Sequence, residues 1–209
     1  MLDSYLRPWI DPFLNVIGKR IVSYGIVANS ITAIGFIFGI AAMGMIAVQQ
    51  YWIGALFFIG NRLCDGLDGA VARNSMLTDF GGFLDIVCDF IIYAGIVFAF
   101  GIAYDNPLYA AFLIFSFIGP MVSFLAYAII AAKRQINTTR CGKKSFYYLG
   151  GLCEGTETAL VLIIFCFFPQ YFGPICIVYG ILCWLTTIGR TYRAWIDFGK
   201  DSSYSLSKV

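Results

Sequence analysis

The chain has 209 residues, of which 60% are hydrophobic and only 12% charged, with a formal net charge of +2. A water-soluble domain carries about 25% charged residues, so the composition excludes an ordinary soluble protein, and we expect no nucleic-acid partner. The absence of histidine excludes Ser-His and Cys-His nucleophiles and His-ligated zinc. The seven cysteines form no CxxC pair and mostly lie in apolar stretches, which is typical of packing residues.

Residues 1–24 are too rich in charge for a membrane span. Apolar side chains recur at helical spacing between the charged ones, which predicts an amphipathic helix on the membrane surface. Pro8 and Pro12 predict two short pieces, with Asp11 as the N-cap of the second. Because the stretch has no clean apolar core, we expect no cleavable signal peptide.

Six apolar stretches follow, each about as long as the 20 residues needed to cross the hydrocarbon of a bilayer. We therefore predict an all-α membrane protein with six transmembrane helices behind the N-terminal surface helix. Residues 1–200 would form a single domain, and the polar residues 201–209 a disordered cytoplasmic tail. The predicted spans are 29–49, 51–73, 82–104, 107–133, 148–169 and 173–195.

Lysine and arginine are unevenly distributed between the two ends of these spans. The turns near residues 50, 105 and 171 contain neither, whereas the opposite ends carry most of them. Cytoplasmic loops are enriched in Lys and Arg. Both termini are therefore predicted to be cytoplasmic.

Five aspartates occur in the stretch DGLDGAVARNSMLTDFGGFLDIVCD, where the second and third predicted spans meet. At 1.5 Å of rise per residue, Asp65 and Asp68 lie roughly 12 and 8 Å inside the cytoplasmic end of their span. Asp85 and Asp89 lie at a similar depth in the next span. Charges inside a membrane indicate function, and the shared depth predicts one cavity open to the cytosol.

The spacing of these aspartates predicts a metal site. Asp65 and Asp68 are three residues apart, and Asp85 and Asp89 four, so each pair shares one helix face. Four carboxylates in a low dielectric repel one another, and the nearby Arg62 and Arg73 balance only two of them. Mg²⁺ or Mn²⁺, which prefer oxygen ligands, would remove the repulsion. A cation transporter is the alternative, although transporters usually bind their cargo near the middle of the membrane.

Small side chains and an arginine accompany the carboxylates. Gly66, Gly69, Ala70 and Ala72 keep one helix face open to a ligand, although such residues alone are more typical of helix packing. Arg73, one turn past Gly69, can hold a phosphate. Together these residues indicate a diphosphate bound at the membrane surface, and a transfer reaction that depends on charge neutralisation and positioning.

The aspartate stretch resembles the signature of the CDP-alcohol phosphotransferase (CDP-alcohol phosphatidyltransferase) family, which is long and rarely matched by chance. Every signature residue is present, with seven residues instead of the commonest eight between the arginine and the next glycine. The six-span layout is similar too, so the resemblance covers nearly the whole chain. The stretches KSFYYLGG and EGTET resemble a bacterial subgroup whose acceptor is unassigned.

The resemblance implies transfer of a phosphatidyl group from CDP-diacylglycerol to a small hydroxyl acceptor, with release of CMP, in phospholipid biosynthesis. It implies Mg²⁺ or Mn²⁺ as cofactor, as two ions. Asp65, Asp68 and Asp85 would hold the first ion, and Asp89, with shared carboxylates, the second. Asp89 also matches the family's proposed general base.

The resemblance further implies a donor site, a location and an assembly. The chain would be a multi-pass protein of the bacterial inner membrane and a homodimer. A transporter, or a protein that binds a CDP-lipid without turnover, remains an alternative to the enzyme. The CDP site would contain Gly69, Ala72 and Arg73, together with Asn29 and Thr32 of an element in which Ala28 replaces the usual proline.

Three more charged residues share the depth of the aspartates, namely Glu154, Glu157 and Arg190. One hypothesis is a buried ion pair between the fifth and sixth spans. The other is a polar wall that recognises the hydroxyls of the acceptor.

The segment between the fourth and fifth spans is basic. The positive-inside rule and attraction to anionic lipids account for its charges. The alternative is that Arg140, Lys143 and Lys144 bind an acceptor that itself carries a phosphate, such as a glycerol or inositol phosphate.

Overall fold

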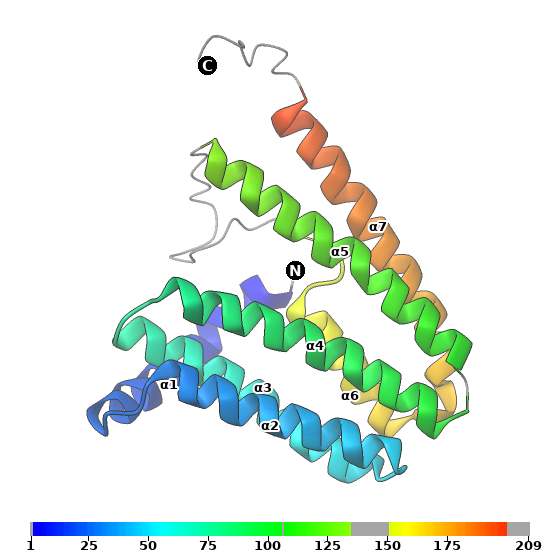
Figure 1. The fold of residues 1–209 in the computed structure, drawn as a ribbon, viewed down its shortest axis with the longest axis horizontal. Coiled ribbons are helices and arrows are strands. Elements are labelled where there is room, and N and C mark those ends of the chain that lie inside the picture. Colours follow the sequence, from blue (N-terminus) through cyan, green and yellow to red (C-terminus); the bar gives the residue numbers. More distant parts are fainter. Residues whose placement is uncertain (1, 106, 135–150, 200–209) are drawn as a thin grey trace.

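The computed structural model describes residues 2–105, 107–134 and 151–199. These ranges fold into helices and contain no strand, which confirms the all-α prediction. Figure 1 shows the arrangement. The helices are α1 (Leu2–Ser23), α2 (Ala28–Ala47), α3 (Tyr51–Asn74), α4 (Asp79–Ala103), α5 (Pro107–Lys133), α6 (Gly155–Phe167), the 3₁₀ turn η1 (Pro169–Tyr171) and α7 (Phe172–Phe198).

Within the described residues, four helical segments are long and apolar enough to cross a membrane: α2, α4, α5 and the unit formed by η1 and α7. These segments make the chain a multi-pass membrane protein. Helix α3 is also long, but it carries two arginines and two aspartates between residues 62 and 73. Helix α6 has only 13 residues, which gives a length of roughly 20 Å. The count of six spans therefore stays a prediction.

The N-terminal segment is one continuous helix, so the prediction of two pieces with Asp11 as an N-cap was wrong. Pro8 and Pro12 lie inside α1. They are four residues apart and share one face, so each removes one hydrogen bond on that face while the bonds on the other faces continue. The surface location of α1 stays a prediction. The helix ends at a turn where Gly25 has φ +77°, a conformation that glycine adopts without strain.

Small residues let the helices approach closely. Figure 1 shows α2 alongside α3 and α4, and α5 alongside α7. A Cβ atom on Gly39 of α2 would lie 2.4 Å from Cδ1 of Ile92 on α4. A Cβ atom on Gly180 of α7 would lie 2.5 Å from Cε1 of Phe112 on α5. In lipid, where apolar burial does not drive helices together, close packing of this kind holds them in contact.

An aromatic core closes one end of the bundle. The ring of Phe100 lies 5.4 Å from the rings of Phe165 and Phe172 and 5.5 Å from the ring of Tyr51, measured between centroids. Phe100 follows Asp89 by eleven residues on α4, a distance of roughly 16 Å along the helix. The core therefore fixes α3, α4, α6 and α7 relative to one another well away from the aspartates.

The fifth predicted helix begins later than expected. Helix α6 starts at Gly155 instead of near residue 148, and residues 135–150 lie outside the described ranges. The backbone amides of Leu152 and Cys153 donate to Oγ1 of Thr186 on α7, at 3.2 and 3.1 Å. Because these amides donate their hydrogen bonds to α7, residues 151–154 form a turn and not the first turn of a helix. Glu154, predicted inside a span, is the N-cap residue of α6.

Candidate active site

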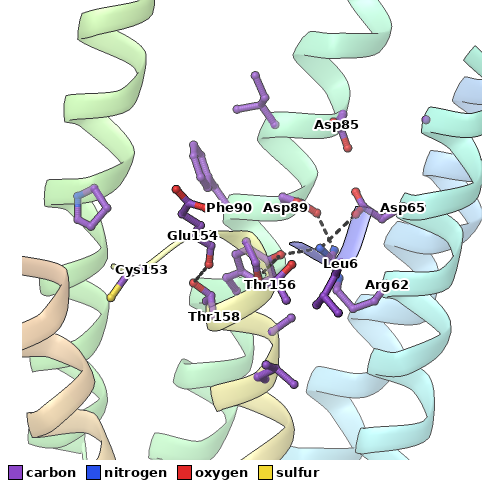
Figure 2. A pocket seen from close by; sticks show the side chains of 18 of the residues that line it. Leu6, Arg62, Asp65, Asp85, Asp89, Phe90, Cys153, Glu154, Thr156 and Thr158 are labelled. Atoms are coloured by element: carbon purple, nitrogen blue, oxygen red, sulfur yellow. Dashed lines mark hydrogen bonds and ion pairs between the residues drawn. The ribbon is translucent and has the colours of Figure 1, made fainter. Parts of the chain in front are cut away.

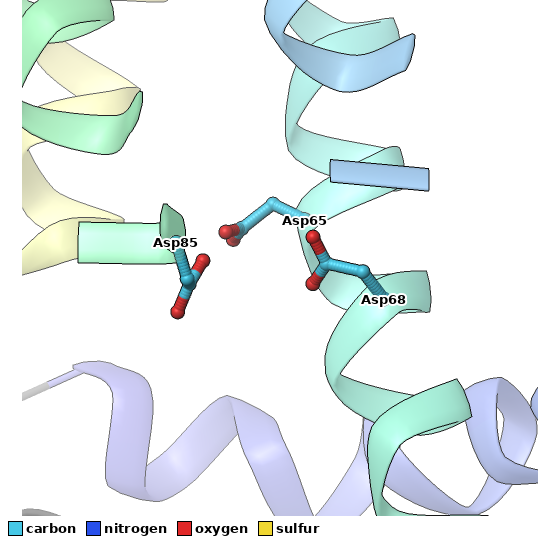
Figure 3. A group of neighbouring side chains, drawn as sticks. All are labelled: Asp65, Asp68 and Asp85. Atoms are coloured by element: carbon cyan, nitrogen blue, oxygen red, sulfur yellow. The ribbon is translucent and has the colours of Figure 1, made fainter. Parts of the chain in front are cut away.

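Three aspartates from two helices meet at one point. Asp65 and Asp68 on α3 and Asp85 on α4 each offer a carboxylate oxygen, and these oxygens all lie within 4.8 Å of one another. Figure 3 shows the three carboxylates directed into the same space. Helix α4 begins just before this point, where Oγ1 of Thr78 accepts from the amide of Gly81 at 3.0 Å and caps its first turn.

The carboxylate of Asp68 is hydrogen-bonded to a residue of α2. Asp68 is buried, and the hydroxyl of Thr32 donates a hydrogen bond to its Oδ2. Asn29, one turn earlier on α2, places its Oδ1 only 3.1 Å from the position that a Cβ of Gly81 would take. Asn29 and Thr32 thus lie where α2 meets α3 and α4, and Gly81 allows this approach.

Asp89 is bound by an arginine from the neighbouring helix. Nη2 of Arg62 lies 2.6 Å from Oδ1 of Asp89, and Nη1 of the same guanidinium lies 3.6 Å from Oδ2 of Asp65. Nη1 also donates to the hydroxyl of Tyr93 at 2.6 Å. Figure 2 shows Arg62 reaching from α3 towards these two carboxylates.

These groups line one cavity of about 690 Å³, which is in the size range of small-molecule sites. Most of the charged side chains that line it come from α3 and α4. Side chains of α1, α5 and α6 add an apolar wall, with Leu6, Ile10 and Phe124 among them. The predicted site residues that line it are Asp65, Asp68, Gly69, Arg73, Asp85, Asp89, Glu154 and Arg190. Of the others in the described ranges, Ala72 is half-buried on α3, and Glu157 lies in the first turn of α6.

The side chain of Arg73 folds back over Gly69, which lies one turn earlier on α3. Its Nη1 lies 3.3 Å from the position that a Cβ of Gly69 would occupy, and its Nη2 lies 3.7 Å from Oδ1 of Asp11 on α1. Both partners of this ion pair are about one-third exposed, and pairs of that kind contribute little stability. The pair with Asp11 therefore holds Arg73 only weakly.

Glu154 and Arg190 lie on the side of the cavity formed by α6 and α7. Oε1 of Glu154 accepts from the amide of Gly151 at 2.8 Å, within the turn that precedes α6. Nη1 of Arg190 donates to the carbonyl of Pro120 on α5 at 2.7 Å. The basic residues Arg140, Lys143 and Lys144 lie outside the described ranges.

A charge swap between Glu154 and Arg190 is expected to fail. Each single reversal, Glu154→Arg or Arg190→Glu, loses a charged hydrogen bond, and we expect a cost of about 1–3 kcal/mol in the free energy of unfolding. The double variant should not recover, because a carboxylate at position 190 would face the carbonyl of Pro120. Thermal unfolding and enzymatic turnover of the four proteins measure this, and recovery in the double variant would instead establish the ion pair.

The sequence pattern predicts Arg62 only as a counter-charge, and it does not predict the contacts of Tyr93 and Asn61 with it. The spacing contained a signal for Tyr93, since Asp85, Asp89 and Tyr93 are each four residues apart and share one face of α4. Asn61 precedes Arg62 and is buried. A buried amide requires partners, but the sequence does not identify them.

The chain is similar to proteins of one family over most of its length. The model of the family described as CDP-alcohol phosphatidyltransferase matches residues 25–191. Inner membrane protein YnjF of Escherichia coli is 44% identical over 198 residues, which cover 94% of this chain and 96% of that protein. Archaetidylinositol phosphate synthase of Pyrococcus horikoshii is 30% identical over 196 residues, which cover 91% and 95%.

A solved structure has the same fold. The crystal structure of phosphatidylinositol phosphate synthase from Mycobacterium tuberculosis, with CDP-DAG bound, matches with a TM-score of 0.64. The match covers 94% of this chain and 98% of that one, at 18% sequence identity. At that identity, the match establishes the arrangement of the helices.

Proposed function

Because the chain belongs to the CDP-alcohol phosphatidyltransferase family, we propose that it transfers the phosphatidyl group of CDP-diacylglycerol to a hydroxyl acceptor and releases CMP. The enzyme acts in phospholipid biosynthesis as a multi-pass protein of the bacterial inner membrane. The observation that carries the proposal is the meeting of Asp65, Asp68 and Asp85 inside a cavity that Asp89 and Arg73 also line.

The carboxylates fit a divalent cation. Three carboxylate oxygens within 4.8 Å of one another repel unless a cation lies between them, and an all-oxygen ligand set suits Mg²⁺ or Mn²⁺. Asp65, Asp68 and Asp85 would hold one ion, and Asp89 with shared carboxylates a second. Bound ions would neutralise the charge of the diphosphate during transfer.

The donor head group would lie along the glycine-rich face of α3. The solved relative that has CDP-DAG bound supports this class of donor. Arg73 is exposed at the end of α3 and presents a planar fork of N–H donors to a phosphate. Gly69 leaves room beneath the guanidinium. The proposed donor residues are Gly69, Ala72, Arg73, Asn29 and Thr32.

The chain's own groups then direct the transfer. The acceptor hydroxyl attacks the phosphorus that carries the diacylglycerol, and its proton passes to the carboxylate of Asp89. A new P–O bond to the acceptor forms, the P–O bond to the CMP oxygen breaks, and CMP leaves. Positioning of the two substrates lowers the barrier because little covalent chemistry is required of the protein.

The acceptor would be a phosphorylated alcohol such as an inositol phosphate. A relative that is 30% identical is named archaetidylinositol phosphate synthase, and its name supports this class. Glu154, Glu157 and Arg190 would contact the acceptor from α6 and α7. Arg140, Lys143 and Lys144 would attract its phosphate, which the aspartates alone repel.

Neutralising these three basic residues tests their role. Substitution of Arg140, Lys143 and Lys144 by glutamine is expected to raise the KM for inositol phosphate by about tenfold or more, since a charged hydrogen bond contributes about 1.5–3 kcal/mol. The KM for CDP-diacylglycerol should stay nearly unchanged. If the enzyme prefers an uncharged alcohol, or if the substitutions change only the membrane topology, the three basic residues do not bind the acceptor. Their charges are then explained by the positive-inside rule alone.

Release of CMP is the test of the proposed function. Purified protein in lipid nanodiscs, given CDP-diacylglycerol and a panel of hydroxyl compounds that includes inositol phosphate and glycerol phosphate, should release CMP and form the corresponding phospholipid. Removal of divalent cations with a chelator should stop the reaction, and Mg²⁺ or Mn²⁺ should restore it. A protein that binds CDP-diacylglycerol without releasing CMP, or that moves cations instead, would overturn the proposal.

Two further features complete the proposal. The protein would have both termini in the cytoplasm, as the distribution of Lys and Arg predicts, and would form a homodimer. Cysteine labelling of each terminus from either side of the membrane determines the first, and the mass of the protein in nanodiscs the second.

A further inference from the structure

The guanidinium of Arg62 is anchored from the side away from the aspartates. Nε and Nη2 of Arg62 both donate to Oδ1 of Asn61, at 2.9 and 2.7 Å. The other end of the Asn61 amide, Nδ2, donates to the carbonyl of Gly35 on α2 at 2.8 Å. Because Asn61 is buried and bound to a second helix, it fixes the plane of the guanidinium as well as the position of its positive charge.

Aromatic rings hold the same guanidinium from another direction. Its central carbon lies 4.8 Å from the centre of the Tyr93 ring and 5.6 Å from that of Phe58, distances typical of cation–π contact. The Tyr93 hydroxyl accepts from Nη1 at 2.6 Å and donates to the carbonyl of Gly155 at 3.4 Å. Arg62 is thereby connected to the first residue of α6, next to the acceptor wall at Glu154.

The anchored guanidinium presents one N–H to one oxygen of Asp89. The distance from Nη2 to Oδ1 is 2.6 Å, whereas the nearest distance to Asp65 is 3.6 Å. A hydrogen bond prefers to lie near the plane of the carboxylate that accepts it, so a fixed donor restricts that plane and with it the direction of the second oxygen. Arg62 is thus built to orient Asp89 in preference to Asp65.

We propose that Arg62 is a positioning residue, which holds the Asp89 carboxylate at the angle from which it takes the proton of the acceptor hydroxyl. The inference rests on the proposed function. A counter-ion needs only a positive charge near the aspartates, and a lysine at position 62 would supply it. The contacts with Asn61, Tyr93 and Asp89 instead require the planar fork that only arginine has.

The experiment compares Arg62→Lys and Arg62→Ala with the wild type. Purified full-length proteins in nanodiscs receive CDP-diacylglycerol, inositol phosphate and Mg²⁺. For each protein we measure kcat, both KM values, the Kd for CDP by calorimetry and the thermal unfolding temperature. Arg193→Ala is the matched control, because Arg193 pairs with Asp197 at the exposed end of α7.

We expect kcat of Arg62→Lys to fall about 100-fold, the loss that follows a misplacement of about 1 Å. The KM for CDP-diacylglycerol and the Kd for CDP should remain within about threefold of wild type, since Arg62 acts on Asp89 and not on the donor. Added guanidinium ions at millimolar concentration should restore part of the activity of Arg62→Ala, whereas ammonium ions should not. Arg193→Ala should match the wild type.

Three results would overturn the inference: full activity of Arg62→Lys, equal rescue by guanidinium and ammonium, or a fall in CDP affinity that parallels the fall in kcat.

If neither Arg62 variant folds, the variant Tyr93→Phe tests the inference instead. It removes one partner of the guanidinium and keeps the ring, so a fall of about tenfold in kcat supports the inference and an unchanged kcat overturns it. If the wild-type protein releases no CMP with any acceptor, the proposed function itself is wrong. If the wild type is active and Arg62→Lys is equally active, only the inference about Arg62 is wrong.

Discussion

Asp85→Asn and Asp68→Asn are each expected to lower the rate of CMP release by a factor on the order of 10²–10³, the loss typical when one group that stabilises the charge of a transition state is removed. Both carboxylates belong to the group whose oxygens lie within 4.8 Å of one another. Asparagine has nearly the same shape but only one oxygen and no charge, so it binds a divalent cation much more weakly. Initial rates over a range of Mg²⁺ concentrations measure the effect.

The fold should survive these substitutions. The hydroxyl of Thr32 donates to Oδ2 of Asp68, and the amide oxygen of an asparagine accepts the same bond. Removal of one of several close negative charges also relieves repulsion when no cation is bound. We therefore expect an unfolding temperature at or above that of the wild type in the presence of a chelator.

Asp79→Asn is the matched control for these two variants. Asp79 lies in the same aspartate-rich stretch, but it is exposed in the first turn of α4 and is not one of the three clustered carboxylates. Its activity should stay close to that of the wild type. Full activity of Asp68→Asn or Asp85→Asn at unchanged metal concentration would contradict the phosphatidyltransferase mechanism, because neither carboxylate would then hold a required ion.

The helices and the convergence of the aspartates follow from local rules that a sequence displays. Long apolar stretches predict helices, and spacings of three and four residues place Asp65 with Asp68, and Asp85 with Asp89, on one face each. The short connection between α3 and α4 brings aspartates of both helices to one cavity, although the two helices do not pack closely against each other and α2 packs against both. Where position depends only on helical periodicity and a short turn, the prediction agrees with the structure.

The start of α6 depends on contacts that the sequence does not display. The amides of Leu152 and Cys153 donate hydrogen bonds to Thr186, which lies more than 30 residues away in the sequence. Residues 151–154 therefore form a turn where the apolar composition predicts a helix. Helix α1, by contrast, continues through Pro8 and Pro12, because the two prolines share one face and the hydrogen bonds of the other faces remain. Helix ends are set by tertiary partners as well as by composition.

The network around Arg62 was also beyond prediction, for a related reason. Counting charges identified Arg62 as one of two arginines near four aspartates, but not which aspartate it would bind. That choice depends on Asn61 and Tyr93, which orient the guanidinium towards Oδ1 of Asp89. Hydrogen-bond geometry between side chains on different helices is set only when the helices have packed.

Asp89→Asn is expected to separate chemistry from donor binding. Turnover should fall by about two to four orders of magnitude, the contribution typical of a general base. Affinity for CDP should stay nearly unchanged. The amide oxygen of an asparagine can still accept from Nη2 of Arg62, which lies 2.6 Å from Oδ1 in the wild type. The geometry around position 89 is then kept, while the group that accepts the proton is lost.

Rates of CMP release and CDP binding by calorimetry, measured on one preparation, test the separation. Asp197→Asn is the control for loss of an aspartate that pairs with an arginine, because Asp197 contacts Arg193 at 2.9 Å at the far end of α7. If CDP affinity collapses together with turnover in Asp89→Asn, Asp89 acts chiefly as a ligand of the second ion, since an ion that holds the diphosphate affects binding before it affects chemistry. If only turnover falls, and a rise in Mg²⁺ does not restore it, the missing group is the base that receives the acceptor's proton.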